Sequence, residues 1–346
     1  MKIAIIGAGF FGSTIALKLS EQHTVHLYEK ENNILNGASK VNQFRFHMGF
    51  HYPRSQRTIK EIKSSYKLFL NFYSNRVFGK TKNYYTVSNK GSKTSYNKFL
   101  KTIRNNKLKH KITSLKFPKT SKLILTNEKV LDYFKFKKLL EQKIKKSSVK
   151  LFLKKQFQKK NLNYYDKIII CTYSSNNGLL KNLSSNYKKS VNRFELIEKI
   201  LIKLPKRYKN HSYVVIDGKF VCLDPYLGTN YHLLSDVKYS KIEVIKKELP
   251  NFKSYKNKYL NKEIQKNLRQ SNFNKFIKHS SNYLPFLKEA KYVGSMFVIR
   301  ALKKNVEKTD ERTGDIKFVD KKIISVFSGK WNTCVSVANR LKDMFR

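Results

Sequence analysis

The first thirty residues follow a pattern of hydrophobic and polar positions that predicts a β-α-β unit. Residues 2–6 are apolar and β-branched, as a short buried strand is, and residues 23–29 alternate between apolar and polar positions, as a second strand does. Between them, residues 7–12 are rich in glycine and predict a turn, and residues 13–20 have a helical composition. The pattern therefore predicts a strand, a turn, a helix and a second strand.

The middle of the chain mixes helical and extended patterns. Residues 31–56 have a loop-like composition that is rich in polar and aromatic side chains, and residues 57–75 show helical spacing. Residues 80–130 mix short strands with lysine-rich turns. Residues 133–146 predict an amphipathic helix whose candidate inward positions are Phe134, Leu139, Leu140 and Ile144.

The second half predicts mainly strands. Residues 193–237 are expected to form consecutive strands, with Asp217 and Gly218 in a hairpin turn. Residues 240–290 are rich in lysine and are expected to be helical. Further strands are expected at residues 167–172, 291–302 and 323–327, with a closing helix at 332–345.

The glycine-rich turn has the spacing of a nucleotide-binding motif. Gly7, Gly9 and Gly12 fit G-x-G-x-x-G, in which the glycines permit a tight turn, the approach of a pyrophosphate and close packing of the helix on the strand. The helix that begins near Phe10 offers unpaired N–H groups and its positive dipole end to phosphates. Glu29 closes the second strand, where a carboxylate accepts hydrogen bonds from ribose hydroxyls and disfavours a 2′-phosphate. The unit predicts a dinucleotide site, and the motif by itself leaves FAD and NAD open.

Length and charge add two constraints. A chain of 346 residues is too long for one simple core and suits two closely packed domains. The formal net charge is +50, which fits either a nucleic-acid or anionic-surface partner or the compositional drift of an AT-rich genome. The lysines are spread along almost the whole chain, which favours drift. With either origin, the charge should attract anionic substrates.

Cysteine usage and hydropathy bear on location. Cys171, Cys222 and Cys334 are scattered and form no C-x-x-C pair, which favours a reducing compartment and no zinc cluster. No run approaches the roughly 20 apolar residues of a membrane-spanning helix. The apolar stretch 3–19 has the hydropathy of a signal peptide, but its regularly spaced glycines have no role in one. A cytoplasmic protein is therefore expected.

Three segments resemble a known flavoprotein family. Residues 38–52 resemble the second conserved block of the D-amino-acid-oxidase-like family, which includes glycerol-3-phosphate dehydrogenases, L-2-hydroxyglutarate oxidases and glycine/sarcosine oxidases. Residues 165–172 resemble its third flavin block, and residues 324–333 its closing strand-Gly-Gly-Lys-x-Thr-helix block. Two departures stand out, because Tyr173 and Ser328 occupy positions where the family usually has glycine.

The resemblance implies an α/β fold in which a Rossmann-like FAD-binding domain is joined to a second, mostly antiparallel β-sheet substrate domain. The FAD-binding domain is expected to be discontinuous and to comprise residues 1–75, 130–185 and 295–346, and the substrate domain to comprise 76–129 and 186–294. With FAD as the cofactor, the expected cofactor-binding residues are Gly7, Ala8, Gly9, Phe10, Phe11, Gly12, Glu29, Lys30, Ser39, Thr172, Gly329, Lys330, Trp331, Asn332 and Thr333.

The resemblance also implies catalytic and substrate-binding residues. The family transfers a hydride from a C–H that bears a hydroxyl or amine to flavin N5, and His47 and His51 are candidates for accepting the accompanying proton. Arg300 takes the position of an arginine that grips a substrate carboxylate or phosphate bidentately. The two histidines are four residues apart, but no Glu or Cys in this segment completes a metal site, so no metal is expected. The expected substrate-binding residues are Tyr52, Tyr226, Tyr231 and Arg300.

The favoured function is therefore an FAD-dependent oxidoreductase that acts on a small anionic substrate, such as a 2-hydroxy acid, an amino acid or a phosphorylated or sugar alcohol. Two alternatives remain open at this point. One is a flavoenzyme that modifies tRNA, and the other is a flavoprotein that acts in sugar metabolism without net redox chemistry. The sequence specifies neither the electron acceptor nor the oligomeric state.

Overall fold

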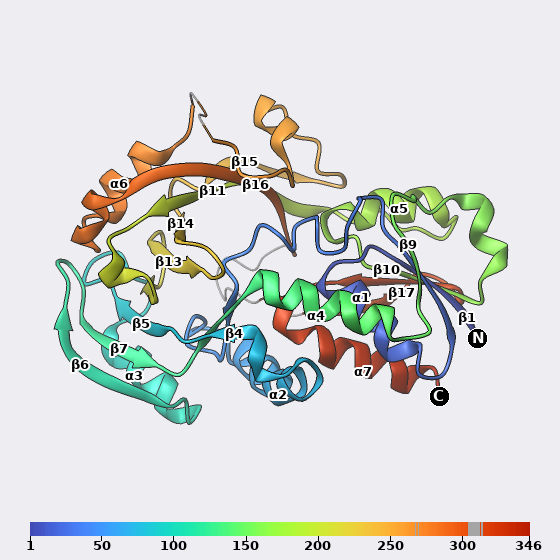
Figure 1. Ribbon diagram of the computed structural model, residues 1–346, viewed down its shortest axis with the longest axis horizontal. Helices are drawn as coiled ribbons and strands as arrows, with labels where there is room; N and C mark the ends of the chain where they lie inside the picture. Colours follow the sequence, from blue (N-terminus) through green and yellow to red (C-terminus); the bar gives the residue numbers. More distant parts are fainter. Residues whose placement is uncertain (267, 269, 304–311, 313) are drawn as a thin grey trace.

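A six-stranded sheet forms one half of the molecule, on the right of Figure 1. Its central strand β1 (Lys2–Ile6) pairs in parallel with β2 and β10. These three strands are apolar, so they can be buried on both faces, as the strands of a parallel sheet are. The strand order from edge to edge is β17 (Asp315–Phe318), β18 (Ile323–Phe327), β10 (Lys167–Ile170), β1, β2 (Thr24–Tyr28) and β9 (Lys150–Phe152). Only β17 runs antiparallel to its neighbour. The computed structural model describes the whole chain except residues 267, 269, 304–311 and 313.

Helices cover both faces of this sheet. Ile3 and Ile5 of β1 pack into the core that α1, α4 and α7 share, whereas Ala4 and Ile6 pack with α5 on the opposite face. This division follows from the alternation of side chains along a strand. The helices are α1 (Phe10–Leu19), α2 (Gln56–Tyr73), α4 (Tyr133–Lys145), α5 (Asn176–Leu183) and α7 (Cys334–Met344).

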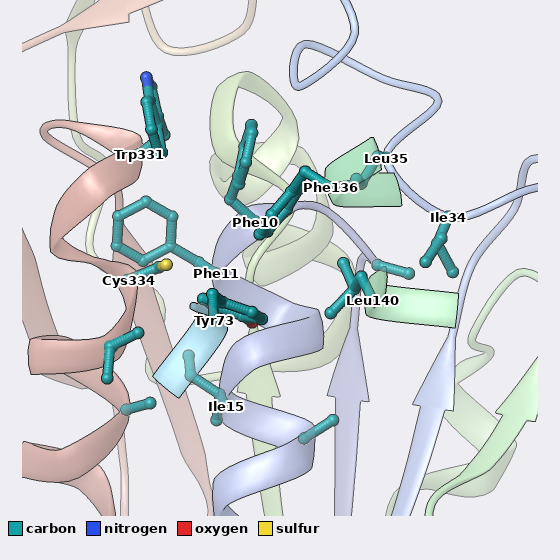
Figure 2. Packing of buried hydrophobic residues seen from close by; sticks show 14 of the residues in the cluster. Phe10, Phe11, Ile15, Ile34, Leu35, Tyr73, Phe136, Leu140, Trp331 and Cys334 are labelled. Carbon is teal, nitrogen blue, oxygen red and sulfur yellow. The ribbon is translucent and has the colours of Figure 1, made fainter. Parts of the chain in front are cut away.

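Aromatic rings fill the core above α1. Phe10 stacks on Phe136 of α4 and on Trp331, with ring centroids 5.1 Å apart in both pairs (Figure 2). Trp331 also stacks on Phe46 and contacts Phe69 of α2. Offset aromatic pairs of this kind contribute about 0.5–1.5 kcal/mol each beyond the area that they bury. They fix the start of α1 against segments from both ends of the chain.

A nine-stranded sheet forms the other half. It is antiparallel except that β5 and β12 run parallel, and the long strands β11 and β16 pair along most of their lengths. The order is β15 (Lys241–Lys247), β11 (Asn192–Lys203), β14 (Tyr231–Asp236), β13 (Val221–Tyr226), β12 (His211–Ile216), β5 (Lys82–Val87), β7 (Lys122–Thr126) and β6 (His110–Lys116), with β16 (Lys291–Leu302) beside β11. Helices α3 (Tyr96–Asn105) and α6 (Phe273–Ser280) lie beside this nine-stranded sheet.

A small three-stranded sheet links the two halves. Its order is β3 (Arg45–Phe46), β8 (Lys129–Leu131) and β4 (Phe78–Gly79), and all its pairs are antiparallel. It anchors the loop that leads from β2 towards α2. The loop therefore runs between the two larger sheets.

Several sequence predictions are confirmed. The strands at 291–302 and 323–327 have the bounds that the sequence predicted, and β12 and β13 pair as a hairpin around Asp217 and Gly218. The first β-α-β unit is also confirmed, with α1 beginning at Phe10.

Two predictions are wrong. Residues 240–290 are not mainly helical, because 241–247 form β15 on β11 and, of the residues described in this segment, only 273–280 form an α-helix. Pairing with β11 outweighs the lysine-rich composition of β15. Phe134 was expected to point inward, but its side chain is 45% exposed, and the buried face of α4 carries Tyr133, Phe136, Leu140 and Ile144.

One boundary of the expected domains falls inside a strand. Residues 295–302, which the sequence grouped with the FAD-binding part, lie in β16 and pair with β11 in the nine-stranded sheet. The division into two domains otherwise stays a prediction. Among the described residues, no helix is long and apolar enough to cross a lipid bilayer.

Candidate active site

A cavity of about 360 Å³ opens between the two large sheets. On one side it meets the segments that directly follow β1, β10 and β18, where ligands bind in open sheets of parallel strands. On the other side it meets the inner faces of β11, β13, β14 and β16. The sequence-predicted residues on its wall are Gly9, Phe10, Phe11, Ser39, His47, His51, Arg300, Gly329, Lys330 and Trp331.

The three glycines of the turn are required for different geometric reasons. Gly7 has φ +98°, and a Cβ there would lie 2.8 Å from the carbonyl oxygen of Cys171. A Cβ on Gly12 would lie 1.8 Å from the carbonyl oxygen of Gly7. Gly9 has no such backbone conflict; its nearest neighbour would be Ser39 Oγ at 3.0 Å, and it lines the cavity. The first and third glycines serve the protein's own packing, and the second leaves space on the cavity side.

Glu29 lies at the end of β2, beside the glycine turn. Its Oε2 accepts a hydrogen bond from the Ala8 amide at 2.8 Å, and its Oε1 accepts one from the Glu31 amide at 3.0 Å. Burial raises the pKa of the Glu29 carboxyl group. Lys30 points into solvent, with its side chain 69% exposed. Neither residue lines the cavity, so a ribose contact by Glu29 stays a prediction.

The closing block bridges the two ends of the chain. After β18, Lys330 and Trp331 line the cavity, and the 3-10 turn η7 (Trp331–Thr333) leads into α7. Asn332 is fully buried and donates from Nδ2 to the carbonyl oxygen of His47 at 3.1 Å. Thr333 donates from Oγ1 to the carbonyl oxygen of Lys330 at 2.8 Å. Asn332 and Thr333 therefore hold neighbouring segments and do not line the cavity.

His47 and His51 lie together on the wall, with ring centroids 5.2 Å apart. Burial lowers the pKa of both imidazoles well below the ordinary value, and the positive charge of Lys330 lowers both further. Both rings are therefore neutral at pH 7. The Nδ1 atoms of both are buried and have no hydrogen-bond partner in the part of the chain that the structure describes. Tyr52 packs against both rings and receives the Lys330 ammonium over its own ring at 4.6 Å.

Arg300 reaches the cavity wall but is already bound to a carboxylate. Its Nε donates to Glu195 Oε2 at 2.8 Å, and its Nη2 donates to the same oxygen. Burial by itself would raise the pKa of the Glu195 carboxyl, but the positive charges of Arg300 and Lys241 hold this pKa below its usual value. Arg193 also pairs with this carboxylate, at 2.8 Å. Much of the planar fork of Arg300 is thus occupied by the protein itself.

The two departures from the family pattern have different consequences. Tyr173 adopts φ +56°, the left-handed region that glycine enters without cost. Its hydroxyl donates to the carbonyl oxygen of Ala301 at 3.2 Å and accepts from the Ala301 amide at 3.1 Å. These bonds tie the turn after β10 to β16. Ser328 is not among the residues with positive φ, so a serine fits the backbone there.

Three predicted tyrosines and one threonine do not line the cavity. Tyr226 lies at the end of β13, near the tip of the β13–β14 hairpin and away from the cavity. It stacks there on Phe44, with ring centroids 5.9 Å apart. Tyr231 is its cross-strand partner there. Tyr52 lies behind the histidine pair, and Thr172 donates from Oγ1 to Asn176 Oδ1 at 2.9 Å.

A polar cluster around Arg45 reaches the cavity wall and was not predicted from the sequence. Arg45 is 1% exposed, and its guanidinium donates to Asp224 at 2.7 Å and to Glu128 at 3.3 Å. Tyr85 donates to Glu128 at 2.7 Å, and Ser212 donates to Asp224 at 2.5 Å. Arg45 lies within the block 38–52 that resembles the flavoprotein family, but the positions of its two carboxylate partners depend on strand pairing.

Lys199 and Gln43 also line the cavity and were missed. In β11, Lys199 interrupts a run of apolar residues at positions 196–197 and 200–202. This interruption is the feature of the sequence that could have identified Lys199 as a candidate site residue. A buried lysine in the middle of a strand requires a polar partner or a ligand.

The residues present fit an FAD molecule. The N-terminus of α1 opens towards the cavity at Gly9, Phe10 and Phe11, and its first-turn amides are suited to a pyrophosphate. The same cavity is lined by the histidine pair and by Gly329 and Lys330, so one elongated molecule can extend from the turn to the closing block. FAD would be held by these two segments, with the acidic Glu29 nearby for the ribose.

Comparison with known proteins agrees with this fit. Residues 2–141 match the family model described as FAD dependent oxidoreductase (DAO). The FAD-dependent monooxygenase FPY4 of Fusarium mangiferae is 35% identical over 98 residues, which span 28% of this chain and 27% of that protein. The alignment therefore covers only about a quarter of the curated relative.

Solved structures extend the similarity to the whole fold. Glycine oxidase from Geobacillus kaustophilus superposes with a TM-score of 0.69 at 12% identity, covering 99% of this chain and 93% of the other. L-proline dehydrogenase from P. horikoshii gives 0.70 at 14% identity, with 99% and 92% covered. Dithionite-reduced L-α-glycerophosphate oxidase from Mycoplasma pneumoniae with FAD bound gives 0.70 at 15% identity, with 98% and 92% covered. The nucleotide turn, the cavity, the match of residues 2–141 to the family model and the shared fold together make this chain similar to the FAD-dependent oxidoreductases of the DAO family.

Proposed function

We propose that this protein is an FAD-dependent oxidase or dehydrogenase that removes a hydride from a small anionic substrate. The hydride would leave a C–H that bears a hydroxyl or amine, as in a 2-hydroxy acid, an amino acid or a phosphorylated or sugar alcohol. The observation that carries the proposal is the charge of the cavity wall.

All the charged side chains among the described lining residues are basic. No Asp or Glu is among them, whereas Arg45, Lys199, Lys241, Arg300, Lys303, Arg312 and Lys330 are. Electrostatic interactions are stronger in a water-poor cavity than in bulk solvent, so an anionic substrate is favoured over a neutral or cationic one. The carboxylates that pair with some of these cations, such as Glu195, lie behind the wall.

The bound flavin supplies a hydride acceptor, and the protein must supply a proton acceptor and a means of orienting the substrate. His47 and His51 are neutral and line the cavity, so either imidazole can accept a proton or a hydrogen bond from the hydroxyl or amine. Lys330 beside them disfavours the protonated imidazole, which promotes return of the proton after the step. Arg300 contributes its charge to substrate binding, although Glu195 shares its fork.

Anaerobic reduction of the flavin tests the proposal directly. The purified protein, loaded with FAD, is mixed with 2-hydroxy acids, amino acids and glycerol phosphates, and the flavin absorbance near 450 nm is followed. We expect at least one anionic compound to bleach the flavin, and its neutral ester or amide to be far less effective. Failure of every anion in the panel, together with bleaching by a neutral alcohol or amine, would contradict the proposal.

A nucleic-acid substrate is the second candidate, because the net charge of +50 gives any polyanion a strong attraction. It predicts that tRNA retards the protein in a native gel at physiological salt and that tRNA is required for turnover. The cavity cations do not require a polymer, since a single carboxylate or phosphate satisfies them. Flavin bleaching by a small anion in the absence of RNA would exclude the tRNA alternative.

A further inference from the structure

Lys199 is a buried lysine in the middle of β11. Alternation along the strand turns it to the same side as Ile197, and both side chains line the cavity. The residue is 7% exposed. An ammonium group in such a position loses most of its hydration and must find its hydrogen-bond acceptors inside the protein or on a ligand.

One acceptor is provided by Gln43. Lys199 Nζ donates to Gln43 Oε1 at 2.5 Å, and Ser235 Oγ donates to the same oxygen at 3.0 Å. The amide nitrogen of Gln43 donates to the carbonyl oxygens of Cys222 at 3.1 Å and Leu233 at 2.9 Å. The β13–β14 hairpin thereby fixes Gln43 with its oxygen towards the lysine. Within the described residues this is the one hydrogen bond of an ammonium that has three donors.

The charged groups around Lys199 do not neutralise it. Asp224 on β13 is bonded to Arg45, Ser212 and the Cys222 thiol, and it forms no ion pair with Lys199. Arg300 on β16 is a like charge, and burial keeps the Cys222 thiol protonated by raising its pKa. Burial, opposed by Cys222 and Asp224 and assisted by Arg300, lowers the pKa of Lys199 to about 8. At pH 7 the group is therefore mainly an ammonium.

We propose that Lys199 anchors the anionic group of the substrate, with its buried ammonium donating to a carboxylate or phosphate oxygen while Gln43 holds it in position. The inference rests on the proposed function, in which the cavity accepts a small anion, and it identifies the binding group. Arg300 is the competing candidate. Its Nε and Nη2 already donate to Glu195, whereas Lys199 has donors to spare and no carboxylate partner among the described residues.

Acetate is a suitable probe, because it carries the anion without a C–H that the enzyme can oxidise at a hydroxyl or amine. Its binding to the FAD-loaded protein is measured from the change in the visible flavin spectrum. Lys199→Met should raise the acetate Kd on the order of 10- to 100-fold, as expected for loss of one charged hydrogen bond. Gln43 keeps Ser235 as a donor in this variant, so the wall should remain folded. Lys203→Met, an exposed position on the same strand, is the matched control and should leave the Kd unchanged.

The pH dependence separates an anchor from a structural lysine. In the wild-type protein, acetate affinity should fall about tenfold per pH unit above pH 8, because the ammonium loses its proton there, and acetate itself does not titrate in this range. In Lys199→Arg, the guanidinium stays charged and this loss should disappear. A lysine that only supported Gln43 would give neither effect.

Three outcomes overturn the anchor. The first is an unchanged acetate Kd in Lys199→Met, and the second is a large loss in Arg300→Lys with none in Lys199→Met. The third is release of FAD from Lys199→Met, which would assign the lysine to the cofactor. Failure of the proposed function looks different, because acetate binding would still depend on Lys199 while no compound in the substrate panel reduced the flavin.

Discussion

At the scale of single residues, the glycine turn shows how a short motif can combine structural and functional requirements. Gly7 and Gly12 are fixed by backbone atoms of the protein, with a Cβ predicted to collide at 2.8 Å and 1.8 Å. Gly9 meets only a side-chain hydroxyl, at 3.0 Å, and faces the cavity. Substitution of Gly9 is therefore the one change of the three that probes the cofactor without first breaking the turn.

We expect Gly9→Val to weaken FAD binding while leaving the protein folded. The added side chain occupies the space in front of the α1 amides, and a crowded fit of this kind costs about 1–3 kcal/mol, or roughly 10- to 100-fold in affinity. The measurements are the flavin absorbance of the purified protein and its circular dichroism. Gly37→Val is the matched control, because a Cβ on Gly37 meets nothing within 4 Å. A Gly9→Val protein that purifies with a full complement of FAD would show that the turn does not hold the pyrophosphate.

At the scale of elements, local pattern was sufficient for some strands and insufficient for others. The segments 291–302 and 323–327 are mainly apolar, and their bounds were predictable because burial of most of their side chains leaves little choice of conformation. The strand β15 was missed, because its lysines hide a short alternation of Ile242 and Val244 and its pairing partner is remote in sequence. Strand pairing is also what brings Lys199 and Arg45 to the cavity, so the residues of the candidate site that depend on it could not be predicted. The turn, the histidine pair and Lys330 were predictable because their segments carry recognisable motifs.

The contact between Tyr173 and β16 gives a prediction at this scale. A tyrosine in the left-handed region costs roughly 1–2 kcal/mol relative to glycine, and the two hydrogen bonds to Ala301 offset that cost. Tyr173→Phe keeps the strained backbone and leaves two buried main-chain groups unpaired, so we expect the free energy of unfolding to fall by about 1–3 kcal/mol. Urea unfolding measures it.

Tyr255→Phe is the control for loss of a tyrosine hydroxyl, because Tyr255 is 48% exposed and its bond to Gln270 lies at the surface. Its free energy of unfolding should change by less than about 0.5 kcal/mol. Equal effects in Tyr173→Phe and Tyr255→Phe would mean that the tie to β16 contributes no particular stability.

At the scale of the whole molecule, the cavity is assembled from segments far apart in sequence. Its wall includes the turn at Gly9, the loop around His47, the inner face of β11 and the closing block at Lys330. The hydrogen bond from Asn332 to the His47 carbonyl joins residues 285 positions apart. Any change that separates the two large sheets should therefore affect every part of the site together.

The chain contains a single tryptophan, and it lies on this wall. Trp331 stacks on Phe10 next to the turn, so FAD in the cavity would lie within range for energy transfer from the indole. We expect titration of the apoprotein with FAD to quench the tryptophan emission strongly, with a sharp break at equimolar FAD. NAD at the same concentrations is the control ligand, and Gly9→Val the control protein. Weak quenching without a break would place the flavin elsewhere.

The bond between His47 and Asn332 has a consequence for synthesis of the protein on the ribosome. The nucleotide turn and the histidine pair emerge early, but the segment that completes their surroundings is translated 285 residues after His47. Until then, Phe10 lacks its stacking partner Trp331, and the first strand lacks β18 on the far side of β10. The cofactor is therefore bound only late in translation. Until then, the apolar segments that are translated early must be protected from aggregation.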